Sequence, residues 1–255
     1  MLFRIPRSPM RQRIVRVGIA LGMSTWSASP ARAQQSGDDS ARVVVRGVDS
    51  VLVAPSARIR LEVSLRKRML WVVAGTDTLR AVPIAVASGS TLQYGGRRWL
   101  FRLAPGFRTV QVKREQPLWI PPDWHYAEAA LAHDLRVQTL PPRGVRLRDG
   151  RRLQVLDSVV GVITDGDPYF NPLPVDEHIV FDSILYIPPV GTLNRQLSGE
   201  LGQYALDLGD GYLLHGTRDR SSIGTATTHG CIRMGDDDLA WVFAHTPVGA
   251  IVRVR

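Results

Sequence analysis

Two short segments near the C-terminal end of the chain hold residues whose types and spacing are suited to covalent catalysis. They are His215–Thr217 and Thr228–Met234, and the second contains Cys231. Cys231 is the only cysteine in 255 residues, so it cannot form an internal disulfide. A thiolate needs a nearby base or cation to form at neutral pH, and histidine commonly supplies it. The pattern therefore predicts a cysteine nucleophile with a histidine base.

Two other interpretations of Cys231 follow from the residues alone. It could be a small buried hydrophobic residue, or it could join His215 and His229 as ligands of a zinc ion. The two histidines and their flanking glycines favour the nucleophile, and no H-E-x-x-H motif accompanies them. We therefore expect neither a metal ion nor a cofactor. His125, His133, His178 and His245 are assigned no catalytic role.

The first 33 residues have the composition of a secretory signal peptide. A start rich in arginine precedes the mostly apolar run 17–28, and Ala31-Arg32-Ala33 provides a small-x-small cleavage site. We predict cleavage after Ala33 and export to the periplasm or cell wall. The alternative is a membrane anchor, but the run is shorter than the roughly 20 residues that a membrane span needs.

Much of the positive charge lies in this leader. The formal net charge is +9, and residues 1–33 contain six arginines and no acids, so the mature chain carries +3. This modest surplus suits an anionic cell-wall surface but is too small to indicate a nucleic-acid partner. The mature chain is long enough for one sizeable core.

The elements that must position the two segments are mainly strands. Residues 59–63 alternate apolar and charged side chains, as a half-buried strand does, and residues 107–113 also alternate. Further strands are expected at 69–73, 79–86, 204–208, 212–214 and 249–255, and short helices at 124–135 and 236–244. The sequence thus predicts a mostly β fold with a few short helices.

With Ser222-Ile223-Gly224 between them, the two segments resemble the catalytic motif of the L,D-transpeptidases that carry a YkuD domain. Weaker likeness extends over residues 59–89, 117–122, 187–208 and 238–254. The resemblance implies a β-rich sandwich or barrel-like catalytic domain at 59–255, preceded by a leader and first strands at 34–58. Thr228 stands where the family more often has serine. Residues 123–178 exceed the common core and are interpreted as an insertion or lid.

The resemblance also implies an activity. Cys231 would attack the carbonyl at the L-centre of diaminopimelate in a peptidoglycan tetrapeptide stem and release D-alanine. The resulting thioester would pass its acyl group to an amine, either on a second stem or on a wall-attached protein. Carbapenems would acylate the same sulfur.

Each predicted site residue has an expected role. His215 is the expected base. The resemblance implies that the backbone carbonyl of Gly216 orients it, and Asp219 and Asp236 are weaker local candidates for that orienting group. The backbone N–H groups of Gly230 and Cys231 are expected to stabilise the oxyanion. Thr228 and Ser222 are expected to hold the loop, and His229 to contact substrate or support the site. Trp119 is expected to line the donor groove or simply to pack. Arg233 is expected to bind a stem carboxylate or to pair with Asp236, Asp237 or Asp238.

Two further functions are compatible with the same residues. With water as the acceptor, the enzyme would be an L,D-carboxypeptidase or another hydrolase, because the Cys–His chemistry is identical. A wall-binding protein without activity would keep the fold and tolerate loss of Cys231. The sequence gives no indication of the oligomeric state.

Overall fold

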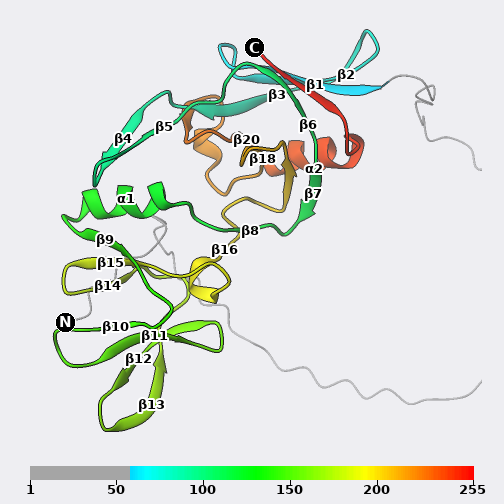
Figure 1. Cartoon of the computed structure of the whole chain (residues 1–255). Coiled ribbons are helices and arrows are strands. Elements are labelled where there is room, and N and C mark those ends of the chain that lie inside the picture. Colours follow the sequence, from blue (N-terminus) through cyan, green and yellow to red (C-terminus); the bar gives the residue numbers. More distant parts are fainter. Residues whose placement is uncertain (1–57) are drawn as a thin grey trace, which may run out of the picture. The chain divides into compact units, whose positions relative to one another are not determined.

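The structure is a computed structural model that describes residues 58–255 (Figure 1). The predicted signal peptide, its cleavage after Ala33 and the first strands before residue 58 lie outside the described residues and stay predictions. Within residues 58–255, no helix has both the length and the apolar character needed to span a bilayer.

Strands dominate the described part of the chain, and the mostly β prediction is confirmed. The largest sheet is curled and has the hydrogen-bonded order β6-β21-β1-β2-β3-β20-β18-β17-β7, with β19 paired to β3 (Figure 1). Its strands are β1 (Ile59–Ser64), β2 (Met69–Ala74), β3 (Asp77–Ala87), β6 (Gly106–Thr109), β7 (Val112–Glu115), β17 (Tyr204–Asp207), β18 (Leu213–His215), β19 (Ala226–Thr228), β20 (Ile232–Met234) and β21 (Ile251–Val254).

The chain between β6 and β7 links the two ends of this sheet. The single strand predicted at 107–113 is wrong, because the extended segment pairs with two different neighbours. The N–H of Val110 donates to Ala250 O (3.0 Å), next to β21, whereas the N–H of Gln111 donates to Asp207 O (2.8 Å) at the end of β17. Two residues thus carry the chain from one edge of the sheet to the other.

The main core lies between this sheet and helix α2 (Asp236–His245). Leu61 and Val63 of β1 are fully buried, as the alternation predicted, and Leu214 and Ile232 belong to the same cluster. Leu239 of α2 packs into it as well. The first turn of α2 contains three aspartates, which complement the positive end of the helix dipole.

Residues 123–187 form smaller sheets with their own apolar clusters. Helix α1 (Asp123–Ala132) buries Tyr126 against Val180 and Leu185. The strands here are β9 (Arg136–Thr139), β10 (Val145–Arg146), β11 (Arg152–Leu156), β12 (Val159–Thr164), β13 (Asp167–Pro172), β14 (Ile179–Phe181) and β15 (Ile184–Ile187). The interpretation of residues 123–178 as an insertion or lid stays a prediction.

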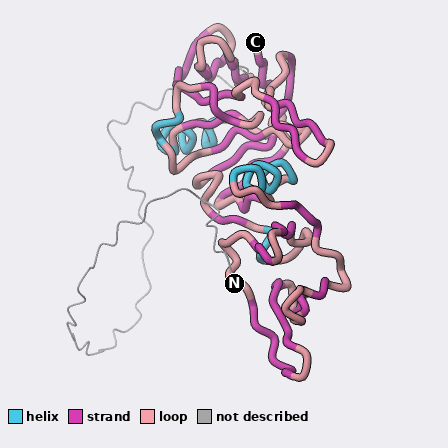
Figure 2. Tube along the Cα trace, turned by 90° about the vertical axis from the view of Figure 1, so that its left-hand side faces the viewer, coloured by secondary structure: helices cyan, strands magenta, loops and turns pink. Residues whose placement is uncertain are grey.

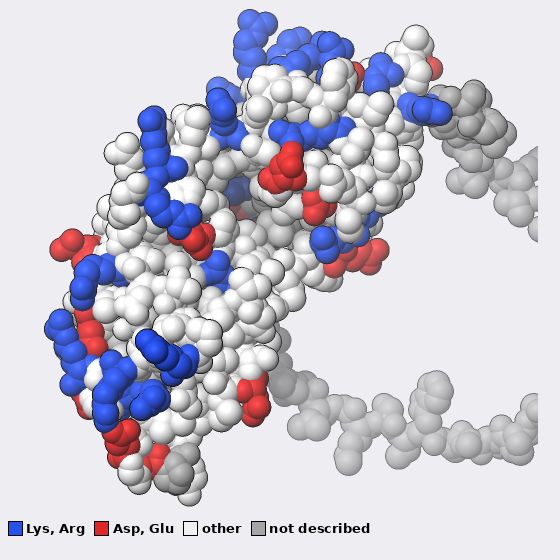
Figure 3. All heavy atoms as spheres, viewed as in Figure 1, with Lys and Arg blue, Asp and Glu red and all other residues white. Residues whose placement is uncertain are grey.

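Two short pairs and two 3-10 turns complete the described elements. They are β4 (Thr91–Tyr94) with β5 (Arg97–Leu100), β8 (Leu118–Trp119) with β16 (Leu197–Ser198), η1 (Leu193–Arg195) and η2 (Arg220–Ser222). The helices are short segments among strands, as Figure 2 shows. On the face drawn in Figure 3, acidic side chains lie among basic ones.

Candidate active site

Strands β18 and β20 bring the two sequence segments together. They are adjacent and parallel, with Leu214 opposite Ile232 and His215 opposite Arg233. Leu214 and Ile232 point into the core, so strand alternation directs His215 and Arg233 to the other face. Cys231 stands two residues before Arg233, directly before β20. The fold therefore places the predicted base beside the strand that follows the predicted nucleophile.

The imidazole of His215 is buried and fixed by its own neighbour. Its Nδ1 lies 2.7 Å from the carbonyl oxygen of Gly216, which can only accept a hydrogen bond. This contact assigns the ring proton to Nδ1 and leaves a lone pair on Nε2. Burial, assisted by the charge of Arg233, lowers the pKa of His215 to about 4, although the Gly216 hydrogen bond opposes the shift. At neutral pH the ring is uncharged and can accept a proton.

Asp219 and Asp236 make other contacts. Oδ1 of Asp219 accepts hydrogen bonds from the N–H (3.1 Å) and the hydroxyl (2.5 Å) of Ser221 and caps η2. Oδ1 of Asp236 is buried beside Gly216 and has no hydrogen-bond partner in the described structure. The contact to Nδ1 of His215 therefore comes from Gly216.

Cys231 is partly buried, and burial raises the pKa of its thiol. A backbone hydrogen bond from Leu213 and the charge of Arg233 act in the opposite direction. Because the thiol pKa is raised and the pKa of His215 is lowered, both groups are uncharged at rest. The site thus holds a thiol and a neutral base rather than a preformed ion pair.

The loop before β20 is held by Thr228. Its hydroxyl donates to Cys231 O at 2.6 Å and lies 3.5 Å from the N–H of Gly230, at the limit of a hydrogen bond. Gly230 has φ +143°, a conformation that side chains rarely adopt, so the bend at this position favours glycine. Ser222 has a comparable supporting contact, from its hydroxyl to Asp219 O at 2.7 Å.

His229 packs against α1. Its ring stacks on Trp124, with centroids 4.0 Å apart and an interplanar angle of 12°, and meets the edge of Phe101 at 4.4 Å. Its Nε2 lies 3.2 Å from Oε1 of Glu128. Trp119 belongs to the same aromatic group, 6.2 Å from Trp124. These contacts connect His229 to α1, at the start of the segment predicted to be an insertion.

Arg233 forms no ion pair within residues 58–255 with the three aspartates that were its expected partners. Asp237 pairs with Arg220 and Asp238 pairs with Arg80, and Nε of Arg233 is buried without a hydrogen-bond partner. Its charge nevertheless shifts the pKa values of both His215 and Cys231. Arg233 is therefore a cation close to His215 and Cys231, and its charge also lowers the pKa of Asp219.

Sequence reasoning missed the residues that contact His229 from far away in the chain. Glu128 lies 101 residues from His229 in sequence, and Trp124 and Phe101 are similarly remote. Nothing in their local pattern pairs them with the motif. The only available signal was the helix expected at 124–135, which the structure places at Asp123–Ala132.

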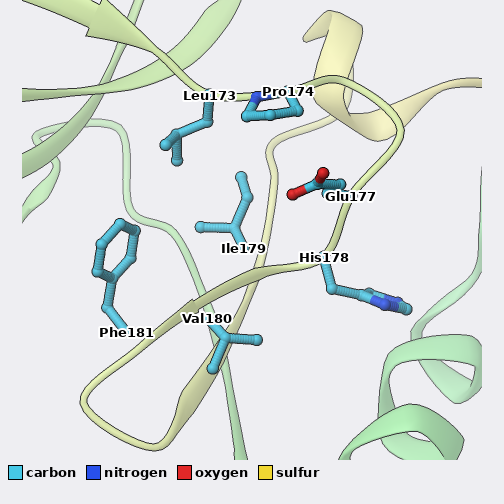
Figure 4. A pocket seen from close by; sticks show the side chains of 7 residues that line it. All are labelled: Leu173, Pro174, Glu177, His178, Ile179, Val180 and Phe181. Carbon is cyan, nitrogen blue, oxygen red and sulfur yellow. The ribbon is translucent and has the colours of Figure 1, made fainter. Parts of the chain in front are cut away.

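Two pockets are lined by residues other than those predicted for this site. Figure 4 shows one around Leu173–Phe181, in which the His178 side chain points towards α1; its ring is 5.4 Å from that of His125. The other lies along β6 and includes Phe107 and Asp210. Among the residues that the structure describes, no three His, Cys, Asp or Glu side chains are arranged to hold a metal ion.

Comparison with known proteins adds a family to this geometry. Residues 58–254 match the model of the YkuD domain, the L,D-transpeptidase catalytic domain. The probable L,D-transpeptidase ErfK/SrfK of Salmonella typhimurium is 24% identical over 187 residues, 73% of this chain and 40% of that protein. The probable L,D-transpeptidase YbiS of Escherichia coli K12 is 40% identical over 53 residues, 21% of this chain and 17% of that protein. The chain thus spans less than half the length of these relatives.

Solved structures with likeness to this chain include an L,D-transpeptidase from Mycobacterium smegmatis, at 14% identity and a TM-score of 0.41 over 78% of this chain and 59% of that one. L,D-transpeptidase 3 of Mycobacterium tuberculosis, solved with a faropenem-derived adduct, has 13% identity and a TM-score of 0.41 over 78% of this chain and 60% of that one.

Proposed function

The chain belongs to the L,D-transpeptidase family with the YkuD catalytic domain, and from this premise we propose that it is an exported cysteine acyltransferase acting on peptidoglycan stem peptides. The observation that carries the proposal is the uncharged, buried imidazole of His215, held at Nδ1 by Gly216 O beside the strand that follows Cys231. A thiol, a neutral base and a group that orients the base are the parts required for nucleophilic catalysis.

The first half-reaction acylates the sulfur. As Sγ of Cys231 attacks the carbonyl carbon at the L-centre of the stem, the thiol proton moves to Nε2 of His215. The N–H groups of Gly230 and Cys231 stabilise the tetrahedral oxyanion, and loss of one such donor raises the barrier by about 2.7–4 kcal/mol in a comparable site. The intermediate then expels D-alanine, whose amine takes the proton back from His215. This leaves a thioester and a neutral imidazole.

Arg233 orients the donor stem in this proposal. Its Nε is buried without a hydrogen-bond partner, and its charge acts on both members of the reactive pair. A carboxylate of the stem would satisfy the guanidinium, which recognises carboxylates well because its donors form a planar fork. A stem carboxylate bound there would give the buried Nε of Arg233 the hydrogen-bond acceptor that it lacks among the described residues.

The second half-reaction releases the acyl group. An acceptor amine attacks the thioester carbon and forms an amide, and the departing sulfur regains a proton as the Cys231 thiol. If water attacks instead, the product is a tripeptide and the enzyme is a carboxypeptidase. Family membership supports transfer to an amine as the main reaction.

Product analysis tests this proposal. The chain starting at Gln34, with its Cys231→Ala, His215→Gln and His245→Gln variants, is incubated with disaccharide-tetrapeptide, and products are identified by mass spectrometry. His245→Gln is the matched control, because its Nδ1 also contacts a backbone carbonyl, Trp241 O at 2.8 Å, but its ring is exposed.

We expect cross-linked dimer and free D-alanine from the wild type and His245→Gln, none from Cys231→Ala, and a loss of about 100-fold or more in His215→Gln. Tripeptide product without cross-linked dimer would show that the enzyme catalyses hydrolysis and not transfer. Release of D-alanine by Cys231→Ala would overturn the cysteine mechanism.

The exported location rests on the sequence of residues 1–33. We expect the protein recovered from the cell envelope to begin at Gln34, and N-terminal sequencing measures this. An intact leader on the recovered protein would instead favour a membrane anchor.

A further inference from the structure

Helix α1 places a carboxylate close to the loop that carries Cys231. Oε1 of Glu128 lies 3.2 Å from Nε2 of His229. Two residues of fully extended chain span at most about 7 Å, so the Cα atoms of His229 and Cys231 lie within that distance. The Glu128 side chain is 51% exposed and that of His229 is 30% exposed, so a ligand can reach the pair from solvent.

The ring of His229 is fixed in position and in tautomer. Trp124 stacks on one face, and Phe101 contacts the ring with an interplanar angle of 80°. An ionised carboxylate can only accept hydrogen bonds, so the contact to Glu128 places a proton on Nε2. In the neutral ring, Nδ1 then holds a lone pair. An imidazole oriented by a carboxylate is the common arrangement of a general base.

Glu128 keeps its negative charge beside His229 because the pKa of its carboxyl is lowered. The hydrogen bond to His229 is the main cause that lowers the pKa of the Glu128 carboxyl, against the effect of burial. Near Cys231 the site therefore offers two different charges. The cation of Arg233 suits an anionic group of the donor, whereas the anion of Glu128 suits a cationic ligand.

An acceptor amine is such a ligand. At neutral pH a primary amine is an ammonium ion, which cannot attack a thioester until it loses a proton. A site for it needs negative charge to attract the ammonium and a lone pair to take that proton. Glu128 and Nδ1 of His229 supply these two properties next to the loop that would carry the thioester.

We propose that Glu128 and His229 form the binding site of the acceptor amine and prepare it for attack. This inference rests on the proposed function. The charge of Glu128 attracts the ammonium across the His229 ring, and the ammonium gives one proton to Nδ1 of His229, which passes it to water. The neutral amine then forms the C–N bond at the thioester carbon. Its second proton goes through His215 to the sulfur of Cys231 as the C–S bond breaks. His229 acts on the amine directly, and Glu128 orients it and supplies the charge.

A purely structural latch between α1 and the loop is the competing explanation, and a conservative variant separates the two. In Glu128→Gln the amide oxygen can still accept the hydrogen bond from His229, but the negative charge is gone. Asp134→Asn is the matched control, because Asp134 is an exposed acid six residues away. Its φ of 52° is a conformation that asparagine tolerates well.

The experiment measures the two half-reactions separately in wild type, Glu128→Gln and Asp134→Asn. Acylation is followed by the rate of D-alanine release and by the mass of the acyl-enzyme. The ratio of transfer to hydrolysis is measured with a tetrapeptide as acceptor amine, below saturation. Hydroxylamine, which is largely uncharged at pH 7, serves as a second acceptor that needs neither charge attraction nor deprotonation.

We expect Glu128→Gln to acylate within about twofold of wild type, to lose at least tenfold in transfer to the tetrapeptide, and to keep transfer to hydroxylamine. Asp134→Asn should behave as wild type throughout. An unchanged ratio in Glu128→Gln, or an equal loss with both acceptors, would overturn the acceptor site in favour of a latch. A wild type that acylates but transfers to no amine would also overturn it. The absence of any acyl-enzyme in wild type would instead overturn the proposed function, and this site with it.

Discussion

At the scale of single residues, the protonation states of Cys231 and His215 determine how the site works. Burial acts on the two groups in opposite directions, since it raises the pKa of the thiol and lowers that of the imidazole to about 4. Between these two pKa values the free enzyme holds a thiol and a neutral ring. In the proposed mechanism, proton transfer therefore accompanies the attack on the substrate and does not precede it.

The pH dependence of alkylation tests this view. Iodoacetamide reacts with the thiolate, so its rate with Cys231 should be low at neutral pH and rise with a midpoint above the roughly 8.5 of a free thiol. No step is expected near pH 6, because His215 is already deprotonated there. A rate plateau that begins below pH 7 would show that the resting site is a thiolate–imidazolium pair, and that proton transfer precedes the attack.

Two contacts at this scale were expected from the sequence. The carbonyl that the Thr228 hydroxyl contacts lies three residues away, so spacing indicated that contact, whereas the Gly216 carbonyl beside His215 was implied by the family resemblance. Glu128 could not be found in the same way. Its contact with His229 depends on how α1 packs, and neither residue's neighbours encode it.

At the scale of elements, two glycines let the end of β18 approach the start of α2. A Cβ on Gly216 would collide with Oδ1 of Asp236, the first residue of that helix. Gly202 faces the same oxygen with φ +71°. The carbonyl that contacts Nδ1 of His215 therefore belongs to a position where an added Cβ would have to displace the Asp236 carboxylate.

We expect Gly216→Ala to lower the free energy of unfolding by about 1–3 kcal/mol through overpacking, and to reduce acylation because the Gly216 carbonyl is displaced from Nδ1. Gly235→Ala is the matched control. Its Cβ would meet no atom closer than 4.0 Å and its φ is −62°, so stability should change by less than about 1 kcal/mol. Urea denaturation and D-alanine release measure both effects. Wild-type stability and activity in Gly216→Ala would contradict the predicted collision with Asp236.

The strands were predictable where one face is buried. Alternation in β1 and the hairpin of β17 and β18 follow directly from the residues. The extended segment at 107–113 was also evident, but its division between β6 and β7 was not. That division depends on pairing with β21 and β17, whose paired residues lie at least 89 positions further along the chain, and alternation within a segment does not specify its partners.

At the scale of the whole molecule, the described chain has separate apolar clusters with different tasks. The cluster under the curled sheet includes Leu214 and Ile232 and fixes the strands that carry the reactive residues. A second cluster positions α1 through Tyr126. The proposed substrate-binding surface thus draws on both, with the donor beside β20 and the acceptor beside α1.

The central claim is that Cys231 carries the acyl group between donor and acceptor. The most direct test is to mix the enzyme briefly with tetrapeptide donor, quench it in acid and map peptides by mass spectrometry. We predict an adduct with the mass of the donor less D-alanine on the peptide containing Cys231, removed by hydroxylamine and absent from Cys231→Ala. Continued D-alanine release with no adduct on Cys231, or an adduct on another residue, would contradict this claim.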